Sequence, residues 1–162
     1  MIKLGLLFSR LRVEEKHLIK EIKSRADIEL VMLDSRKLIV GPKSELNIDV
    51  LLDREISQSR ALHIVQLLRN SHVKCINPYE IVKICGDKAF TSKALRDADI
   101  PTPEVKVAFT KESALTAIEE MGYPAVLKPV DGSWGRLIAK IENRNSAEAI
   151  LEHKSYLSSY YH

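Results

Sequence analysis

The sequence is poor in cysteine, which excludes a scaffold held together by disulfides. Only Cys75 and Cys85 occur in 162 residues, whereas a small secreted domain of that kind would carry more. Neither the spacing of these cysteines nor the histidines around them forms a pattern typical of a metal site. We therefore expect two buried or half-buried thiols in a reducing compartment.

Long apolar runs and a strong charge of one sign are also missing. The apolar start of the chain meets Arg10 and Arg12 at once, no cleavage site follows, and no run approaches the ~20 residues that a membrane span needs. The net charge is only +3, and acidic and basic residues are mixed along the chain, unlike the basic patches of nucleic-acid-binding proteins. We expect a cytoplasmic protein that binds neither membrane nor nucleic acid.

The composition, 45% hydrophobic and 29% charged, is typical of a globular protein with a core. In the first half, strand-like and helix-like patterns alternate, which favours a mainly parallel sheet covered by helices. The predicted strands are residues 2–8, 28–33, 48–52 and 73–76, with an edge piece at 38–40, and the predicted helices are 14–23 and 59–68. We therefore predict an α/β fold with a Rossmann-like domain over residues 1–78. Its first strand is followed by FSRLR, without the glycines of a dinucleotide-binding fingerprint.

The second half is organised differently. A short predicted helix at 79–84 breaks at Gly86, and Asp87 is a candidate N-cap for a longer helix to about residue 97. Two prolines near residue 102 make a rigid connector, so we predict a helical linker over residues 79–103. Over residues 104–162 we predict a smaller α+β domain. Its expected elements are strands at 105–109, 124–130 and 137–141, a helix from Thr110 to Gly122, a helix starting at Asn145, and a polar, aromatic tail from residue 154.

The segment with the clearest chemical character is the predicted strand at 124–130 and the loop after it. Alternation places Lys128 on the same face as Val126 and Val130, where an ammonium needs water or an anion. Glycines in the loop let backbone N–H groups converge on an anion, and a serine and an arginine add side-chain donors. The loop residues are Gly132, Ser133, Trp134, Gly135 and Arg136. They indicate a phosphate site, but an ordinary hairpin with a surface lysine fits this segment equally well.

A second lysine lies where a helix does not favour one. Lys88 falls in the first turn of the helix predicted after Asp87, and the helix dipole disfavours a cation at that end. Natural sequences often break such local rules at functional sites. For this residue alone, a solvated lysine paired with Asp87 or Asp97 is the simpler interpretation.

Together, these features resemble the N-terminal part of the ATP-grasp superfamily over the whole chain. The order is similar: a lysine at a helix start, a proline connector, a strand, a helix, a strand with a lysine, and a glycine-rich loop. A leading α/β domain without a phosphate fingerprint precedes it, as in that superfamily. Residues 7–16, 85–88 and 132–136 resemble the RimK-type branch, and within it the LysX/ArgX ligases of lysine and arginine biosynthesis.

The resemblance implies roles for particular residues. It implies two ATP-contacting lysines, a mobile loop that closes over the phosphates, and a strand that walls the site. The implied ATP-binding residues are Lys88, Lys128, Gly132, Ser133, Trp134, Gly135, Arg136, Leu137 and Ile138. Arg10 and Arg12, at the end of the first strand, are weaker candidates for binding substrate carboxylates, and a surface ion pair explains them at least as well.

The resemblance also implies a reaction. ATP activates a carboxylate as an acyl phosphate, and an amine then attacks it; in LysX/ArgX, α-aminoadipate or glutamate is joined to a small acidic carrier protein. We expect the catalytic residues and the Mg²⁺ ligands to lie beyond His162, and the chain to be an N-terminal part that is inactive alone. Its expected partners are ATP, a small acidic amino acid, the carrier protein, and either a second copy or a complementary C-terminal half.

Two other functions remain open at this stage. A RimK-type ligase would add glutamate to a ribosomal protein or a peptide instead of a carrier protein. A non-catalytic α/β module would bind a nucleotide or a partner protein without turnover. The sequence does not decide between α-aminoadipate and glutamate as the substrate.

Overall fold

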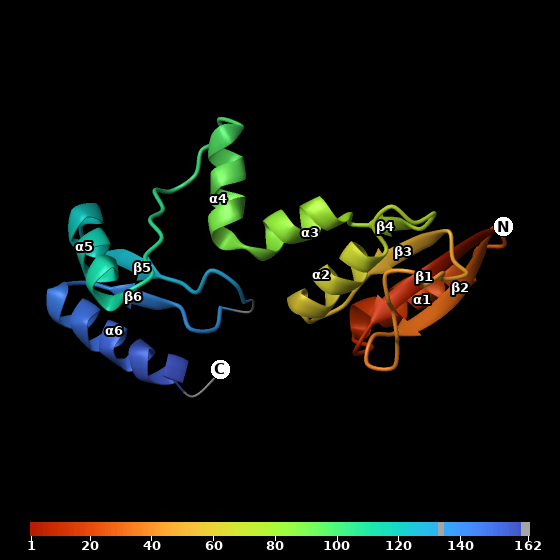
Figure 1. Cartoon of the computed structure of the whole chain (residues 1–162), viewed down its shortest axis with the longest axis horizontal. Coiled ribbons are helices and arrows are strands. Elements are labelled where there is room, and N and C mark those ends of the chain that lie inside the picture. The colour runs from red at the N-terminus through yellow and green to blue at the C-terminus, as the bar shows by residue number, and fades with distance from the viewer. Residues whose placement is uncertain (133–134, 160–162) are drawn as a thin grey trace. The chain divides into compact units, whose positions relative to one another are not determined.

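A computed structural model describes residues 1–132 and 135–159, and the chain forms two compact units, Met1–Gly86 and Asp87–His162. The division falls inside the stretch 79–103 that was predicted as a linker. Helix α3 (Tyr79–Gly86) belongs to the first unit, and helix α4 (Lys88–Asp97) belongs to the second (Figure 1).

The first unit is a four-stranded parallel sheet in the order β2-β1-β3-β4. Its strands are β1 (Ile2–Phe8), β2 (Ile28–Asp34), β3 (Val50–Asp53) and β4 (Lys74–Ile76), and its crossover helices are α1 (Val13–Lys23) and α2 (Gln58–Leu67). The connection from β1 through α1 leads to one edge of the sheet, and the connection from β3 through α2 leads to the other edge. Because such connections are right-handed, α1 and α2 lie on opposite faces of the sheet. Leu6 and Leu7 point to opposite faces, and both are 0% exposed. The predicted Rossmann-like α/β architecture is confirmed.

The core of the first unit lies mainly between the sheet and α2. It includes Leu7, Leu51, Val65 and Leu68, each at most 2% exposed. The edge strand predicted at 38–40 is wrong, because these residues form a loop rather than a ladder. Leu38 and Val40 pack from that loop against the core, which explains the apolar character of this segment.

The second unit is built on a small antiparallel hairpin, β5 (Ala125–Leu127) with β6 (Ala139–Ile141), in which Val126 pairs with Lys140. Its core joins the hairpin to helices α5 (Lys111–Met121) and α6 (Arg144–Ser159) through Ile118, Ala125, Ile141, Ala147 and Leu151. Figure 1 shows these two helices beside the hairpin. Thr110 caps α5 as predicted, because its side chain accepts a hydrogen bond from the Ser113 backbone N–H.

Several predicted boundaries in this unit are wrong. No strand forms at 105–109, where the side chain of Phe109 is 93% exposed, so the alternation there does not mark a buried face. Helix α6 starts earlier than predicted, since Asn143, and not Asn145, caps it by accepting from the Ser146 N–H at 2.9 Å. The helix continues to Ser159, through most of the polar, aromatic stretch that starts at residue 154.

None of the helices in the described ranges is long and apolar enough to cross a membrane. Cys75 is half-buried, as expected, but Cys85 is exposed. The expectation of a sheltered thiol is therefore wrong for Cys85.

Candidate functional site

Lys88 and the glycine-rich loop, which are far apart in the sequence, meet in the second unit. The Lys88 ammonium donates to the Gly132 carbonyl oxygen at 2.8 Å, and the Lys88 backbone N–H donates to the Val130 carbonyl oxygen at 2.9 Å. The carboxylates proposed as simple partners are engaged elsewhere. Asp97 pairs with Lys93, and Asp87 accepts the Phe90 N–H as the N-cap of α4. The first turn of α4 is thus attached to the loop by two hydrogen bonds.

Lys128 lies just after β5 and is exposed. Val126 and Val130, two positions to either side, are 56% and 40% exposed, so the face expected from alternation faces solvent. In the described ranges, neither Lys128 nor Arg136 has a carboxylate partner within ion-pair distance. These two cations are available to an anion.

The loop backbone depends on glycine for its conformation. Gly132 has φ 101° and Gly135 has φ 66°, in the region that side-chain-bearing residues rarely adopt. A Cβ at Gly132 would come no closer than 4.0 Å to Pro129, and one at Gly135 would meet nothing within 4 Å. Glycine is needed here for backbone geometry rather than for space. Ser133 and Trp134, also predicted for this site, lie outside the described residues.

The strands beside the loop are shorter than predicted. Strand β5 ends at Leu127, because Pro129 has no N–H for the ladder and the Val130 carbonyl is bonded to Lys88 instead. Leu137 has φ 57° and lies in a turn, so it does not extend β6, and Ile138 precedes that strand. Leu137 and Ile138 are 70% and 43% exposed, and they form an apolar surface next to the loop.

The two arginines predicted near a substrate differ in environment. Arg10 is exposed in the loop after β1. Arg12 instead binds Glu15, whose side chain is fully buried, with Nε at 2.9 Å and Nη2 at 2.7 Å from its carboxylate oxygens. Arg54, which follows β3, binds the same carboxylate at 3.0 and 3.1 Å. The hydrogen bonds from Arg12 lower the pKa of Glu15 from 4.5 to about 2, although burial opposes this shift.

A second buried carboxylate lies at the same edge of the sheet. The Glu55 side chain accepts hydrogen bonds from the hydroxyls of Ser9 and Ser35 and from the Ser57 backbone N–H. Arg60 lies 3.5 Å away. Burial raises the pKa of Glu55, but the hydrogen bonds outweigh it and the net shift is downward. The buried carboxylates of Glu15 and Glu55 therefore connect the residues that follow the carboxyl ends of β1, β2 and β3.

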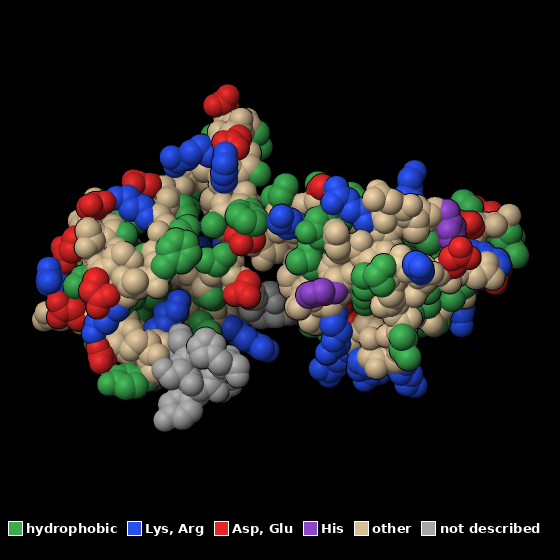
Figure 2. Space-filling view, viewed as in Figure 1, with side chains coloured by type: hydrophobic (Ala, Val, Ile, Leu, Met, Phe, Trp, Pro, Cys, Tyr) green, Lys and Arg blue, Asp and Glu red, His purple; other side chains and the backbone are tan. Residues whose placement is uncertain are grey.

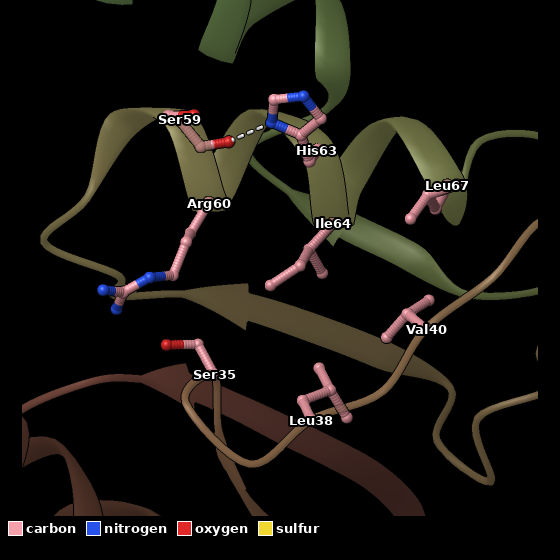
Figure 3. Close-up of a pocket in the computed structure, with 8 residues that line it drawn as sticks. All are labelled: Ser35, Leu38, Val40, Ser59, Arg60, His63, Ile64 and Leu67. Carbon is pink, nitrogen blue, oxygen red and sulfur yellow. Dashed lines mark hydrogen bonds between the residues drawn. The ribbon is translucent and has the colours of Figure 1, made fainter. Parts of the chain in front are cut away.

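A small cavity of about 220 Å³ borders this cluster. Figure 3 shows it between α2 and the segment after β2, with Leu38, Val40, Ile64 and Leu67 forming its apolar wall and Ser35 and Arg60 at one end. Pockets for small molecules usually measure ~300–1,000 Å³, so this cavity does not suit a nucleotide.

The sequence reading missed three residues at these sites. Glu15 could have been found from its position three residues after Arg12 at a helix start, where both side chains share a face. Arg54 and Glu55 could have been found because they follow a buried strand, where parallel sheets present ligands. No group of three or more His, Cys, Asp and Glu side chains in the described ranges could hold a metal ion.

Comparison with known proteins agrees with this arrangement. Residues 4–84 match the LysX preATP-grasp domain, and residues 85–161 match the ATP-grasp domain. The chain is 32% identical over 153 residues to the α-aminoadipate–LysW ligase LysX of Saccharolobus solfataricus, covering 93% of this chain and 55% of that protein. It is 36% identical over 111 residues to the glutamate–LysW ligase ArgX of Sulfurisphaera tokodaii, covering 68% and 39%.

A solved structure gives the same result. The crystal structure of a RimK domain ATP-grasp protein from Sphaerobacter thermophilus superposes with a TM-score of 0.83 at 33% identity, covering 96% of this chain and 59% of that one. The chain thus spans about half the length of the curated relatives it matches. Two domain matches that together cover nearly every residue place the chain in the ATP-grasp superfamily, with a LysX-type pre-ATP-grasp domain ahead of its ATP-grasp residues.

Proposed function

We propose that the second unit binds the phosphates of ATP and that the chain is part of an ATP-dependent carboxylate–amine ligase. The observation that carries this proposal is the attachment of Lys88 to the glycine-rich loop through Val130 and Gly132. Two signals that were separately ambiguous in the sequence lie in one place. A glycine-rich loop beside cations without a carboxylate partner in the described ranges suits a polyanion.

Lys88, Lys128 and Arg136 are proposed to contact the phosphates in different ways. Lys128 and Arg136 supply positive charge without a carboxylate to displace, since none lies within ion-pair distance in the described ranges. Lys88 exchanges its bond to a neutral carbonyl for a stronger charge-assisted bond to a phosphate oxygen. Ser133 and Trp134 are proposed to complete the loop.

The proposed reaction proceeds in two steps. A carboxylate oxygen attacks the γ-phosphorus of ATP, which gives an acyl phosphate and ADP. The amine nitrogen of the second substrate then attacks the acyl carbon, which forms an amide, releases phosphate and leaves a proton to be removed. Positioning and charge neutralisation account for most of the catalysis of such phosphoryl transfer. Mg²⁺ bound with ATP would neutralise further phosphate charge, and we propose that its ligands lie beyond residue 162.

The proposed substrates follow the relatives LysX and ArgX, which are named for ligation of α-aminoadipate or glutamate to LysW. We propose a small acidic amino acid and a carrier protein as the partners of the whole enzyme. The similarity to a RimK domain structure keeps ligation of glutamate to a ribosomal protein or peptide as the second candidate. Offering both acceptors in one ligation assay separates the two candidates.

The phosphate site is tested by titrating ATP into the 162-residue chain and following amide signals by NMR. Lys128→Ala removes an unpaired cation, and Lys88→Met removes the other ammonium. Each is expected to weaken ATP binding by about tenfold to a hundredfold, as for loss of one charge-assisted bond. Lys140→Ala is the matched control, because Lys140 lies on the same hairpin but is paired with Glu142 at 2.6 Å. Equal affinity of the wild type and both test variants would refute the assignment.

A further inference from the structure

One buried carboxylate in the first unit holds two arginines. Glu15 is 0% exposed at its side chain, and it accepts hydrogen bonds from the guanidiniums of Arg12 and Arg54 and from the Arg12 backbone N–H at 3.0 Å. The two arginines follow β1 and β3, which are adjacent in the sheet. The hydrogen bonding between β1 and β3 continues past the end of β3, because the Arg54 backbone N–H donates to the Leu7 carbonyl oxygen at 2.9 Å.

The cluster holds more positive charge than its own packing needs. A single bidentate arginine would neutralise Glu15, and the second guanidinium gives these three side chains a charge of +1, which the carboxyl of Asp53 beside Arg54 offsets only in part because burial favours its neutral form. Glu14 lies 3.9 Å from Arg12 Nε, but its side chain is 64% exposed, so water screens it. The surplus charge is therefore available to an anion from solution.

The free donors of these arginines are exposed to solvent. Each guanidinium contacts Glu15 through its Nε and Nη2 atoms. Because an arginine has five N–H donors, each keeps donors that Glu15 does not use. The side chains of Arg12 and Arg54 are still 27% and 35% exposed. On the face seen in Figure 2, Lys and Arg side chains gather along one edge of the first unit. Two fixed, planar forks with free N–H groups suit a carboxylate.

We propose that Arg12 and Arg54 form a binding site for a carboxylate of a small acidic amino acid, with Glu15 as the residue that positions them. The proposal rests on the proposed function only for the choice of an acidic amino acid as ligand. The position agrees with the general rule that parallel α/β sheets bind ligands at the carboxyl ends of their strands. Glu15 fixes both forks before the ligand arrives, which lowers the entropy lost on binding.

The test titrates L-glutamate, α-aminoadipate and inorganic phosphate separately into the 162-residue chain without nucleotide. The arginine Nε–Hε signals are followed by NMR. We expect shifts of the Arg12 and Arg54 signals with both amino acids, and weaker shifts with phosphate. Arg54→Lys retains the charge but loses the fork, and should weaken glutamate binding about tenfold. Glu14→Gln should leave glutamate binding nearly unchanged, because water screens this exposed carboxylate.

Two controls separate binding from a purely structural role. Glu15→Gln should leave the far-UV circular dichroism unchanged while weakening binding, because both forks lose their anchor. Arg25→Lys should bind as the wild type does, because Arg25 pairs with Asp27 at an exposed position. The proposal is overturned if glutamate leaves both signals unmoved, if phosphate binds more tightly than glutamate, or if Arg54→Lys binds equally well. Because nucleotide is absent, this result is independent of the ATP test on Lys88 and Lys128.

Discussion

The two units hold their cations in opposite ways. In the first unit, Arg12 and Arg54 are fixed on the buried carboxylate of Glu15. In the second unit, Lys128 and Arg136 are exposed and have no carboxylate within ion-pair distance in the described ranges. Fixed guanidiniums suit a small planar anion of one shape, whereas free cations on a glycine loop can adapt to a flexible triphosphate.

The cores that support these sites also differ. The main cluster of the first unit contains nine buried residues against a four-stranded sheet, whereas that of the second contains, among its described residues, five against a two-stranded hairpin. A two-stranded hairpin is marginally stable without helices packed on it. The second unit should therefore be the more sensitive of the two to any loss of core volume.

The largest expected effect comes from core truncation in each unit. Ile141→Ala and Leu51→Ala each empty a fully buried position and should cost about 2–5 kcal/mol. We expect Ile141→Ala to unfold the second unit and abolish ATP binding, while Leu51→Ala weakens the first unit without unfolding it. Hydrogen exchange of amides in β1 and β6 measures the two units separately. Val126→Ala, at a position 56% exposed, is the control, and loss of protection in both units with Ile141→Ala would contradict this prediction.

The next effect concerns the loop backbone. The new Cβ of Gly132→Ala meets only Pro129 Cγ, at an ordinary 4.0 Å, but it places a side chain at φ 101°, which costs about 1–3 kcal/mol. The loop should shift, ATP binding should weaken about tenfold, and the thermal midpoint of the second unit should fall by a few degrees. Gly41→Ala is the matched control, since its new Cβ would lie 3.8 Å from Ser44 Oγ at an ordinary φ. Unchanged ATP affinity for Gly132→Ala would show that the loop geometry does not matter for binding.

The sequence predicted well those elements that local pattern determines. The apolar run of β1, interrupted only by Lys3, predicted both of its ends, because a strand that is buried on two faces over residues 5–8 needs apolar residues there. The Thr110 cap was also readable. The alternation at 105–109 was misleading, since alternation predicts a strand only where a partner and a buried face exist. Leu137 was misplaced because its positive φ is set by the loop, not by its own side chain.

The sites were only partly predictable for a related reason. Lys88 and Gly132 were each identified, but the bond between them joins positions 44 residues apart, which no local pattern specifies. The contact between Arg54 and Glu15 spans 39 residues. Glu15 looks like an ordinary acidic residue in the first turn of a helix, and only the fold reveals that it is buried. Contacts of this kind depend on the packing of strands that local sequence does not determine.

A smaller effect is expected when the fixed cations of the first unit are titrated. The pKa of Glu15 is lowered from 4.5 to about 2 in the folded state. Its contribution to stability is therefore complete above pH 4.5 and is lost as the pH falls from 4.5 towards 2. Because water reaches its partners Arg12 and Arg54, which are 27% and 35% exposed, and screens the interaction, we expect a loss of about 1–2 kcal/mol. Glu15→Gln should remove this part of the pH dependence in denaturant unfolding; an identical pH profile would show that the carboxylate is not held as described.

The smallest effect is expected from Lys93→Met, which removes the other lysine of α4. Comparing it with Lys88→Met shows whether ATP binding depends on Lys88 itself or only on the charge of the helix. Lys93 and Asp97 form an exposed pair on the same helix, with side chains 73% and 60% exposed. An exposed pair of this spacing contributes about 0.3–0.5 kcal/mol, so Lys93→Met should change stability by no more than that and leave ATP binding unchanged. Lys88→Met removes the same charge from the same helix, but it also removes the bond to the Gly132 carbonyl. If ATP titration gave both variants the same reduced affinity, the general charge of α4 would account for binding. A loss confined to Lys88→Met would locate the effect in the position of Lys88 at the loop and not in the general charge of α4, because the change in net charge is identical.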